Sequence, residues 1–415
     1  MRTLILMAFT LLFSVVSAPT VSKTNSKTKT SDRIDKYNKS GLEFYVHDIS
    51  VNTKYTEYAA TTFRNKLIMV SSKKIGGLGN GIDKNTNEPF TELFCLDIDG
   101  HGNISNPLLF SRIINTKANE GQVSFSPDEK TMYFTRSTRE NSKNYKLYKT
   151  SLKENSNGNW INEQELPISN DKYSIENPHV TRDGKLLYFS SNMPGSIGGY
   201  DIYVAKIKAD GSIGEPQNLG TTINTLKDEK FPYTSTDSKK LFISSNGHET
   251  IGGFDIFVSS IVNKNYKSPR NLGAEVNSTN DEIAFVFIDK DTGFFSSNKK
   301  DGLGSFDLYR FKANAIYQQL QGIVVSDKNQ PLSNATVVLL DEEGNEIERQ
   351  TTDIDAHYSF KVKAFENYSV KALKEGFNNF EFAFTSQKTS ENVYRAIVTL
   401  TSKEVKEEVD VAKKK

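Results

Sequence analysis

A pattern that recurs five times constrains this chain more than any other feature of its sequence. The clearest copies end in an aromatic or aliphatic residue followed by Ser-Ser-Asn, at residues 189–192, 243–246 and 295–298. The first hydroxyl residues of the five copies are 64, 55, 54 and 52 residues apart, and they are Ser71, Thr135, Ser190, Ser244 and Ser296. A fixed period of this order is typical of solenoids, propellers and other repeat arrays. Function is therefore expected from an assembly of repeats before any single loop.

Each repeat divides into four short runs of β-forming residues. A turn such as Asp183-Gly184-Lys185 separates the first run from the second, and a glycine-rich loop such as residues 196–199 separates the second from the third. In the third run an aligned polar residue alternates with apolar neighbours, which predicts that it lies on a solvated face. These aligned residues are Glu92, Lys146, Asp201, Asp255 and Asp307. Four antiparallel strands per unit make a propeller blade.

The number of strands predicts how such a ring closes. Copies of the first three strands occur five times after residue 56, but only four copies of the fourth strand lie between them. The fifth copy precedes all the others, within residues 44–51, and is followed by Asn52 and Thr53. We therefore expect a five-bladed β-propeller over residues 42–313, in which the N-terminal strand completes the last blade and leaves only short, protected edges.

The repeats resemble the WD40-like β-propeller repeat of bacterial envelope proteins. That repeat runs Asp-Gly-Lys, then Leu-Tyr-Phe-Ser-Ser-Asn, then Gly-Gly and Asp-Ile-Tyr-Val. Residues 178–204 and 232–258 match strongly, residues 283–310 match well, and residues 56–98 and 119–151 are degenerate. The period exceeds the roughly 40–45 residues of true WD40 blades. The chain also has a single tryptophan, Trp160, so no Trp-Asp signature recurs.

After Lys312 the pattern changes to short alternating strands with turns, which predicts a β-sandwich. Residues 318–400 resemble a carboxypeptidase regulatory-like domain. The matching residues have the form Gly-x-Val-x-Asp, then Pro-Leu-x-x-Ala-x-Val-x-Leu, then Thr-Asp-x-Asp-x-x-Tyr-x-Phe. The resemblance implies a small transthyretin-like β-sandwich without a zinc or catalytic site.

The two ends of the chain carry predictions of their own. Arg2, the apolar run over residues 4–16 and the small residues that follow predict a secretory signal peptide over residues 1–18. Residues 19–41 are a predicted flexible linker, and residues 401–415 are a predicted solvated charged tail. We expect export to the periplasm, with no transmembrane segment in the mature chain.

One glutamate precedes the first strand of every repeat, at spacings of 63, 56, 53 and 53 residues. The set consists of Glu57, Glu120, Glu176, Glu229 and Glu282. Because each precedes an innermost strand, we expect them at one end of the propeller channel. There they would bind a cation or a sugar, or supply the carboxylate pair that glycoside hydrolysis needs. Alternatively, each accepts hydrogen bonds between blades. Repetition in every blade favours the structural role, since an active site needs asymmetry.

The other candidate motifs favour structural roles. Residues 97–103 partly resemble a calcium loop but lack its distal bidentate glutamate, so we expect a turn. Cys95 lies in an apolar strand and is expected to be an inert core thiol. The five histidines show no zinc-ligand spacing, and the loop at 195–199 is not a nucleophile elbow. We predict no catalytic residue, no metal and no cofactor.

The formal net charge of +1 argues against nucleic acid as a partner, since phosphate binding needs a concentrated positive field. The propeller and sandwich together resemble OmpA-family envelope proteins of Bacteroidota that are related to the type IX secretion and gliding apparatus. The resemblance implies a non-catalytic scaffold that binds outer-membrane or periplasmic proteins through its propeller faces. The OmpA-like peptidoglycan-binding domain of that family has no counterpart in this sequence, so direct peptidoglycan binding is not expected.

Two other functions stay open at the level of the sequence. A glycan- or peptide-binding module would need exposed aromatic residues around one channel mouth, and Tyr58, Phe90 and Trp160 are the candidates. A five-bladed glycosidase would need two or three unpaired channel carboxylates that differ from those of the other blades.

Overall fold

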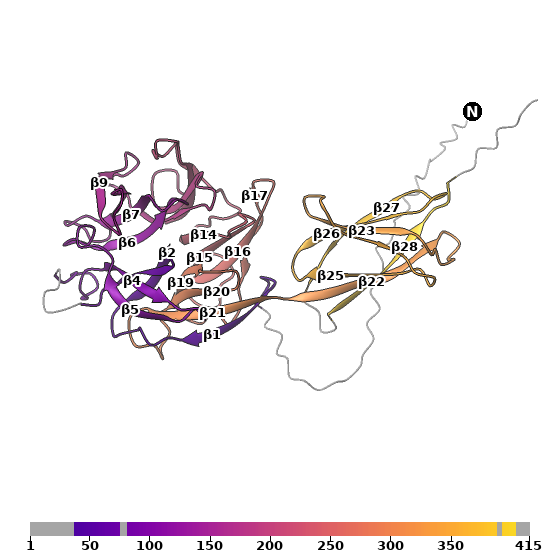
Figure 1. Cartoon of the computed structure of the whole chain (residues 1–415), viewed down its shortest axis with the longest axis horizontal. Coiled ribbons are helices and arrows are strands. Elements are labelled where there is room, and N and C mark those ends of the chain that lie inside the picture. Colours follow the sequence, from indigo (N-terminus) through magenta and orange to yellow (C-terminus); the bar gives the residue numbers. More distant parts are fainter. Residues whose placement is uncertain (1–36, 75–80, 388–391, 404–415) are drawn as a thin grey trace, which may run out of the picture. The chain divides into compact units, whose positions relative to one another are not determined.

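The computed structural model describes residues 37–74, 81–387 and 392–403 of the 415-residue chain. Regular structure within these ranges consists of strands alone, which confirms the predicted all-β fold class (Figure 1). Along the same ranges, no helix offers a membrane-spanning length of apolar residues. The predicted signal peptide, most of the predicted linker and most of the predicted tail lie outside the described residues.

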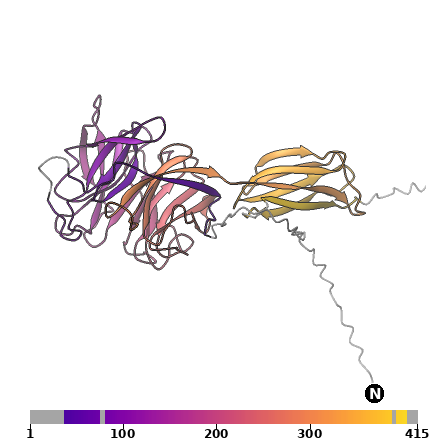
Figure 2. The same ribbon diagram turned by 90° about the horizontal axis from the view of Figure 1, so that it is seen from below.

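The described residues up to Ile316 form five antiparallel sheets with one repeated strand order (Figures 1 and 2). The first sheet contains β2 (Glu57–Phe63), β3 (Lys66–Ser71), β4 (Glu92–Ile98) and β5 (Ile104–Leu109). The second contains β6 (Glu120–Phe125), β7 (Thr131–Ser137), β8 (Tyr145–Leu152) and β9 (Trp160–Glu165). The third contains β10 (Ile175–Val180), β11 (Leu186–Ser191), β12 (Asp201–Lys206) and β13 (Gln217–Asn218).

The last two sheets follow the same order with small changes at their outer edges. The fourth contains β14 (Glu229–Thr234), β15 (Lys240–Ser245), β16 (Asp255–Val262), β17 (Asn265–Tyr266) and β18 (Arg270–Asn271). The fifth contains β19 (Glu282–Phe287), β20 (Thr292–Ser297), β21 (Asp307–Ala315) and, at its outer edge, β1 (Leu42–Asp48). Strand β1 pairs antiparallel with β21, from Leu42 opposite Ala315 to Asp48 opposite Tyr309.

The first strand of each sheet faces the middle of the assembly. Strand β2 neighbours β6, and the contacts continue through β10, β14 and β19 back to β2. This closed cycle makes the unit a β-propeller whose central channel is lined by these five inner strands. Hydrophobic clusters fill the space between neighbouring sheets. One of them packs Phe63 of the first blade against Phe125 and the fully buried Trp160 of the second.

A short polar side chain extends the pairing of the third strand in every blade. The Asn224 amide accepts the Ile202 N–H at 2.8 Å and donates to the Ile202 carbonyl at 3.0 Å. Asn52 makes the same two bonds to Leu308, at 3.0 and 2.9 Å, across 256 residues of sequence. The equivalent residues in the other blades are Asn115, Ser169 and Asn277. The polar corner after each fourth strand therefore fastens it to its own blade.

The aspartates of the third strands do not lie on a solvated face, so that prediction is wrong. Asp201, Asp255 and Asp307 are at most 1 % exposed. Asp201 accepts the Ile197 N–H at 2.6 Å from the preceding glycine-rich loop, and the other two cap their own loops in the same way. The loop has to be glycine-rich because it packs on the next crossover. A Cβ on Gly198 would stand 2.4 Å from the Thr225 carbonyl oxygen.

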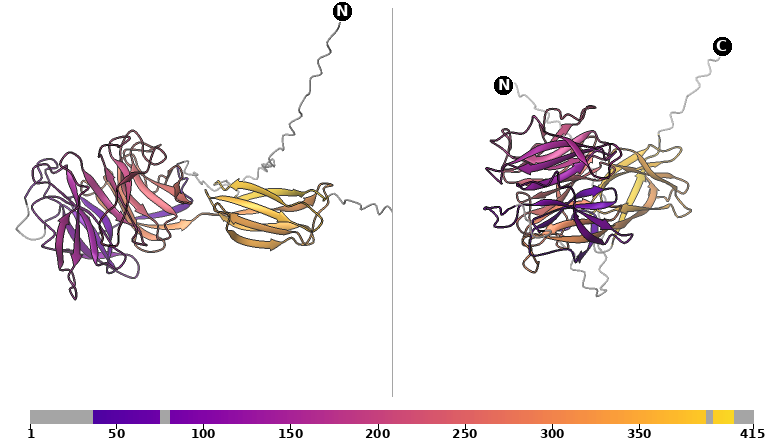
Figure 3. Two further views of the ribbon diagram at one scale, coloured as in Figure 1. Left: turned by 90° about the horizontal axis from the view of Figure 1, so that it is seen from above. Right: turned by 60° about the vertical axis from the view of Figure 1, so that its left-hand side comes forward.

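The second compact unit begins at Tyr317, and its described residues form two sheets. One contains β25 (His357–Lys363), β22 (Tyr317–Ser326) and β28 (Val393–Leu400), with β22 and β28 parallel. The other contains β24 (Glu346–Thr351), β23 (Thr336–Asp341), β26 (Asn367–Leu373) and β27 (Phe380–Thr385). Leu339, Phe360 and Val370 belong to one buried cluster between them, which makes a β-sandwich (Figure 3). Its likeness to transthyretin stays a prediction.

Candidate functional site

Four of the five aligned glutamates are completely buried at the start of an inner strand. They are Glu57, Glu120, Glu229 and Glu282. Each carboxylate is bound by a threonine or serine four residues before it: Glu229 accepts the Thr225 N–H at 2.7 Å and the Thr225 hydroxyl at 2.8 Å. Ser245, on the second strand of the same blade, adds a hydroxyl bond at 2.7 Å. Because Thr225 follows the outer edge of the preceding blade, this network ties neighbouring blades together.

Glu120 carries the largest electrostatic perturbation of the four. Desolvation by burial raises the pKa of this carboxyl to about 7, although Thr116 and Arg136 oppose the shift. Arg136 donates to Oε1 at 3.0 Å, whereas Oε2 is buried and has no hydrogen-bond partner among the described residues. Burial also raises the pKa values of Glu57 and Glu282. These carboxyls are thus enclosed in protein and hydrogen-bonded to it.

Glu176 is the exception in the third blade. The residue four positions earlier is Lys172, which lacks the hydroxyl, so the hydrogen-bond network of the other blades does not form. Glu176 instead accepts from Ser174 at 2.9 Å and from the Lys230 ammonium of the next blade at 2.9 Å. Lys230 also lies over the Tyr200 ring, 3.7 Å from its centre. The five glutamates thus share one end of the channel but have two kinds of environment, and a ligand role for them stays a prediction.

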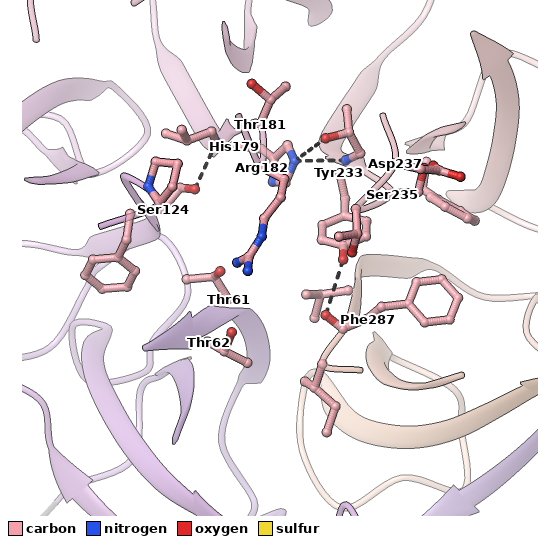
Figure 4. A pocket seen from close by; sticks show the side chains of 18 of the residues that line it. Thr61, Thr62, Ser124, His179, Thr181, Arg182, Tyr233, Ser235, Asp237 and Phe287 are labelled. Carbon is pink, nitrogen blue, oxygen red and sulfur yellow. Dashed lines mark hydrogen bonds between the residues drawn. The ribbon is translucent and has the colours of Figure 1, made fainter. Parts of the chain in front are cut away.

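A cavity of about 840 Å³ opens at the opposite end of the channel (Figure 4). Its wall consists of the last residues of all five inner strands and the turns that follow them. One residue from each strand shows the arrangement: Thr61, Ser124, His179, Thr234 and Phe287. The glutamates begin these strands, so they stand at the far end of the channel from the cavity. Sequence reasoning did not find this cavity, because its residues differ from blade to blade, whereas the glutamates repeat conspicuously.

The channel narrows to a waist below the cavity. Side chains that include Gln122, Pro178 and Phe231 enclose a space of only about 10 Å³ there, at the limit for one water molecule. Bulges interrupt the inner strands at this level, and Phe231 and Ala284 have φ angles of 53° and 58°. Such conformations cost about 1–3 kcal/mol each and often occur at functional sites. Below the cavity the channel is therefore too narrow for a peptide to pass.

His179 forms part of the cavity wall as a neutral imidazole. Its Nε2 atom accepts the Thr234 backbone N–H at 2.9 Å, so the ring proton belongs on Nδ1. Burial lowers the pKa of His179 to about 3. The Tyr233 ring lies 4.9 Å from the imidazole, and its hydroxyl donates to the Phe287 carbonyl at 3.3 Å. This part of the wall is hydrogen-bonded and uncharged at neutral pH.

The charged groups of the cavity stand at its rim. Asp237 accepts the Ser235 hydroxyl at 2.6 Å and the Lys239 N–H at 3.0 Å, and thereby stabilises its own turn. Glu129 accepts the Arg64 N–H at 2.9 Å. Arg182, from the turn after β10, points its guanidinium into the cavity (Figure 4). Over the described residues, this guanidinium has no hydrogen-bond or ion-pair partner.

The aromatic residues that the sequence suggested for a channel mouth do not line the cavity. Trp160 is 1 % exposed and packs between two blades, so its candidacy was wrong. Tyr58 contacts Phe231 near the glutamate end, and Phe90 packs beside Gly81. The aromatic residues that line the cavity are Phe125, Tyr233, Phe242 and Phe287. They alternate with polar residues along the chain, so the sequence did not indicate that they lie together.

The remaining candidates have local structural roles. Asp99 accepts the His101 and Asn103 N–H groups at 2.8 and 2.9 Å, which makes residues 97–103 a turn. Cys95 is half-buried, and burial raises the pKa of its thiol, which disfavours the reactive thiolate. Within the described ranges, no three His, Cys, Asp or Glu side chains are grouped so that they could hold a metal ion.

Comparisons with known proteins find similar folds at low identity. No protein-family model matches the chain, and no curated protein matches it either. TolB from Acinetobacter baumannii is 18% identical over 63% of this chain, with a TM-score of 0.34, and the chain spans only 54% of TolB. RS223 β-xylosidase is 13% identical, with a TM-score of 0.41. The match covers 69% of this chain and 98% of the xylosidase. A GH43_1 enzyme from Xanthomonas citri is 9% identical, with a TM-score of 0.39. The match covers 65% of this chain and 90% of that enzyme. None of these likenesses indicates what this chain binds.

Proposed function

We propose that this chain is a non-catalytic interaction protein whose propeller docks a partner at the cavity. The observation that best supports this is the asymmetric cavity, which ends below in a narrow waist. Its wall presents hydroxyls, aromatic rings and a neutral histidine, together with one unpaired arginine. Cavities of this size are typical of sites for small ligands or short chain segments. A rigid ring that holds variable loops around such a mouth is suited to recognition.

The carboxylates of the cavity favour binding over hydrolysis. A glycosidase needs two carboxyl groups at a defined separation across the sugar bond. The carboxylates that line this cavity are Glu129, Asp237 and Asp289, and all three lie in rim turns. Each accepts a backbone N–H, so each is committed to the local fold. We accordingly propose that the chain performs no reaction.

The cellular setting is part of the same proposal. The predicted signal peptide and the resemblance of the repeats to those of envelope proteins support a periplasmic location. Partners would then be outer-membrane or periplasmic proteins, including components of a secretion or assembly machine such as that of type IX secretion.

The test is affinity purification of the tagged full chain from envelopes of the organism that encodes it, followed by mass spectrometry. Thr62→Trp places a large side chain in the cavity wall and is expected to abolish recovery of a stoichiometric envelope protein. Leu226→Ser is the matched control, because Leu226 is 83% exposed and precedes Glu229 at the other end of the channel.

Recovery of the same partner by both variants would contradict docking at the cavity. Recovery of a polysaccharide in place of a protein would favour the glycan-binding alternative. Release of reducing sugars from that polysaccharide, lost in Thr62→Trp, would overturn the non-catalytic role and establish a glycosidase.

A further inference from the structure

We infer that the cavity binds the carboxyl terminus of a peptide, with the Arg182 guanidinium as the partner of its terminal carboxylate. The inference rests on the docking role proposed above and names the chemical group that is docked. Two features of the cavity support it: an unpaired guanidinium, and a floor that is too narrow for a peptide to pass.

Arg182 is positioned by a tight turn. The Thr181 hydroxyl donates to Asp183 at 2.7 Å and the Gly184 N–H donates to the Thr181 carbonyl at 2.8 Å, which fixes the backbone on both sides of Arg182. The same turn position holds Pro127 in the preceding blade and Thr236 in the following one. A guanidinium at this position therefore distinguishes this blade from its two neighbours, and it supplies the asymmetry that a binding site requires.

The negative groups around the cavity are occupied. Asp289 accepts the Asp291 and Thr292 N–H groups at 2.9 and 2.6 Å, and Asp237 and Glu129 are bound by turn or neighbouring N–H groups. Asp183, beside Arg182, accepts the Lys185 N–H at 3.1 Å and lies 3.7 Å from the Lys185 ammonium. Lys240 and Lys290 also line the cavity and balance two of its three carboxylates in number, so an anionic ligand is recognised through the unpaired Arg182 guanidinium and not through an excess of positive charge.

The form of the cavity favours a chain end over a chain segment. An extended peptide that crosses a site needs an exit, and the waist at Phe231 provides none. A peptide must therefore enter with one terminus first. An amino terminus carries a positive charge and is repelled by Arg182, whereas a carboxyl terminus offers two oxygens to the planar guanidinium fork.

The wall supplies the other groups that such an end requires. Ser124 Oγ accepts the Val180 N–H at 2.9 Å, so its own hydroxyl proton can be donated to a ligand. Thr61 and Thr62 add hydroxyls on the facing strand (Figure 4). The Tyr233 and Phe287 side chains provide apolar surface for the last side chain of the peptide.

The experiment uses the full chain and an array of ten-residue peptides that covers the carboxyl termini of the organism's exported proteins. Each peptide is present as the free acid and as the C-terminal amide, so that the pair differs in one charge. We expect the best free acids to bind about tenfold or more tightly than their amides, because a charged hydrogen-bonded pair is lost in the amide. Arg182→Gln is expected to abolish this difference, and Arg182→Lys to restore part of it.

Arg64→Gln is the matched control. Arg64 occupies a turn of the first blade, and its guanidinium donates to the loop at Ser156 and Asn157 of the next blade. This variant should keep the preference for the free acid, and thermal melting of each variant shows that it is folded. Titration with acetate and inorganic phosphate at constant ionic strength provides the second arm. Competition by either anion as effective as that of the peptide would overturn the peptide assignment.

The outcomes separate this inference from the proposed function. Equal binding of acids and amides, both blocked by Thr62→Trp, would overturn carboxylate recognition and leave docking at the cavity intact. A preference for free acids that survives Arg182→Gln would overturn the role of Arg182. Binding of no peptide at all would overturn the inference, and the purification described above would then decide the docking role separately.

Discussion

At the scale of single residues, the hydrogen-bond partners of each repeated glutamate depend on the residue four positions before it. Threonine or serine at that position supplies a hydroxyl and a backbone N–H to the buried carboxylate in four blades. Lysine at position 172 supplies no such hydroxyl, and Glu176 turns to Lys230 of the next blade instead. One substitution in a repeat thus converts a blade-to-blade hydrogen-bond network into an ion pair.

Thr225→Val is expected to lower the free energy of unfolding of the propeller by about 1–3 kcal/mol, because it removes a hydroxyl bond from the buried Glu229 carboxylate. Thr225→Ser should recover most of the loss. Lys172→Val, at the equivalent position of the third blade, should change stability by less than about 0.5 kcal/mol. Urea unfolding followed by circular dichroism measures all three, and equal effects at positions 225 and 172 would refute this account.

The second residue-scale prediction concerns pH. Burial lowers the pKa of His179 to about 3, against about 6.5 in an unfolded chain. Between these values the unfolded state binds a proton that the folded state does not, so stability falls as the pH drops below about 6.5. The His179→Gln variant lacks this titrating group, so its free energy of unfolding should depend less on pH. Unfolding measured from about pH 8 to pH 4 at constant ionic strength tests it, and parallel curves for both proteins would contradict it.

At the scale of elements, strand β1 closes the ring although it comes first in the chain. It pairs with β21 over seven residues, and Asn52 then adds two bonds to Leu308. Long loops cost little more to close than short ones, since the entropy grows only with the logarithm of length. A strand that is distant in sequence can therefore serve as the outer strand of the last blade.

Asn52→Ala and Asn224→Ala each remove two hydrogen bonds to the third strand of a blade. We expect both to lower stability by about 1–3 kcal/mol. Only Asn52→Ala should also increase hydrogen exchange of the paired amides of β1 and β21. In the other blades, the chain before and after the fourth strand continues within the propeller and holds that strand in place. Amide exchange resolved by mass spectrometry distinguishes the two variants. Unchanged protection of β1 in Asn52→Ala would show that Asn52 has no part in the closure.

At the scale of the whole molecule, two hydrophobic cores of different kinds coexist. The propeller distributes its core between neighbouring blades, whereas the sandwich has one cluster between two sheets. Each unit is large enough to unfold as a cooperative transition of its own.

Phe360→Ala is expected to lower the stability of the sandwich by about 3–5 kcal/mol, because Phe360 is fully buried in its core. The melting temperature of the propeller should not change. Phe380→Ala, at a position that is 36 % exposed on β27, is the control and should have a much smaller effect. Differential scanning calorimetry of the full chain shows both transitions, and a shift of the two together would contradict independent cores.

Much of the fold follows from the sequence alone, because its signals are local. Turns such as Asp183-Gly184-Lys185 and the alternation of the strands predict the blades, and the repeat of about 53 residues predicts their assembly into an all-β propeller. The burial of Asp201 was missed for a local reason as well: a carboxylate that caps a loop looks, in sequence, like one that faces water.

Only the tertiary structure decided which end of the channel holds the large cavity and which residues meet there. His179, Arg182 and Thr234 come from two blades about 54 residues apart, and the bulges of the inner strands determine where their side chains point. A bulge interrupts each of the five inner strands, but no residue pattern in the sequence indicates the bulges or the narrow waist. The repeated glutamates were visible in the sequence because the blades need them in common. The cavity depends on how the blades differ, and those differences acquire a shared location only when the ring is assembled.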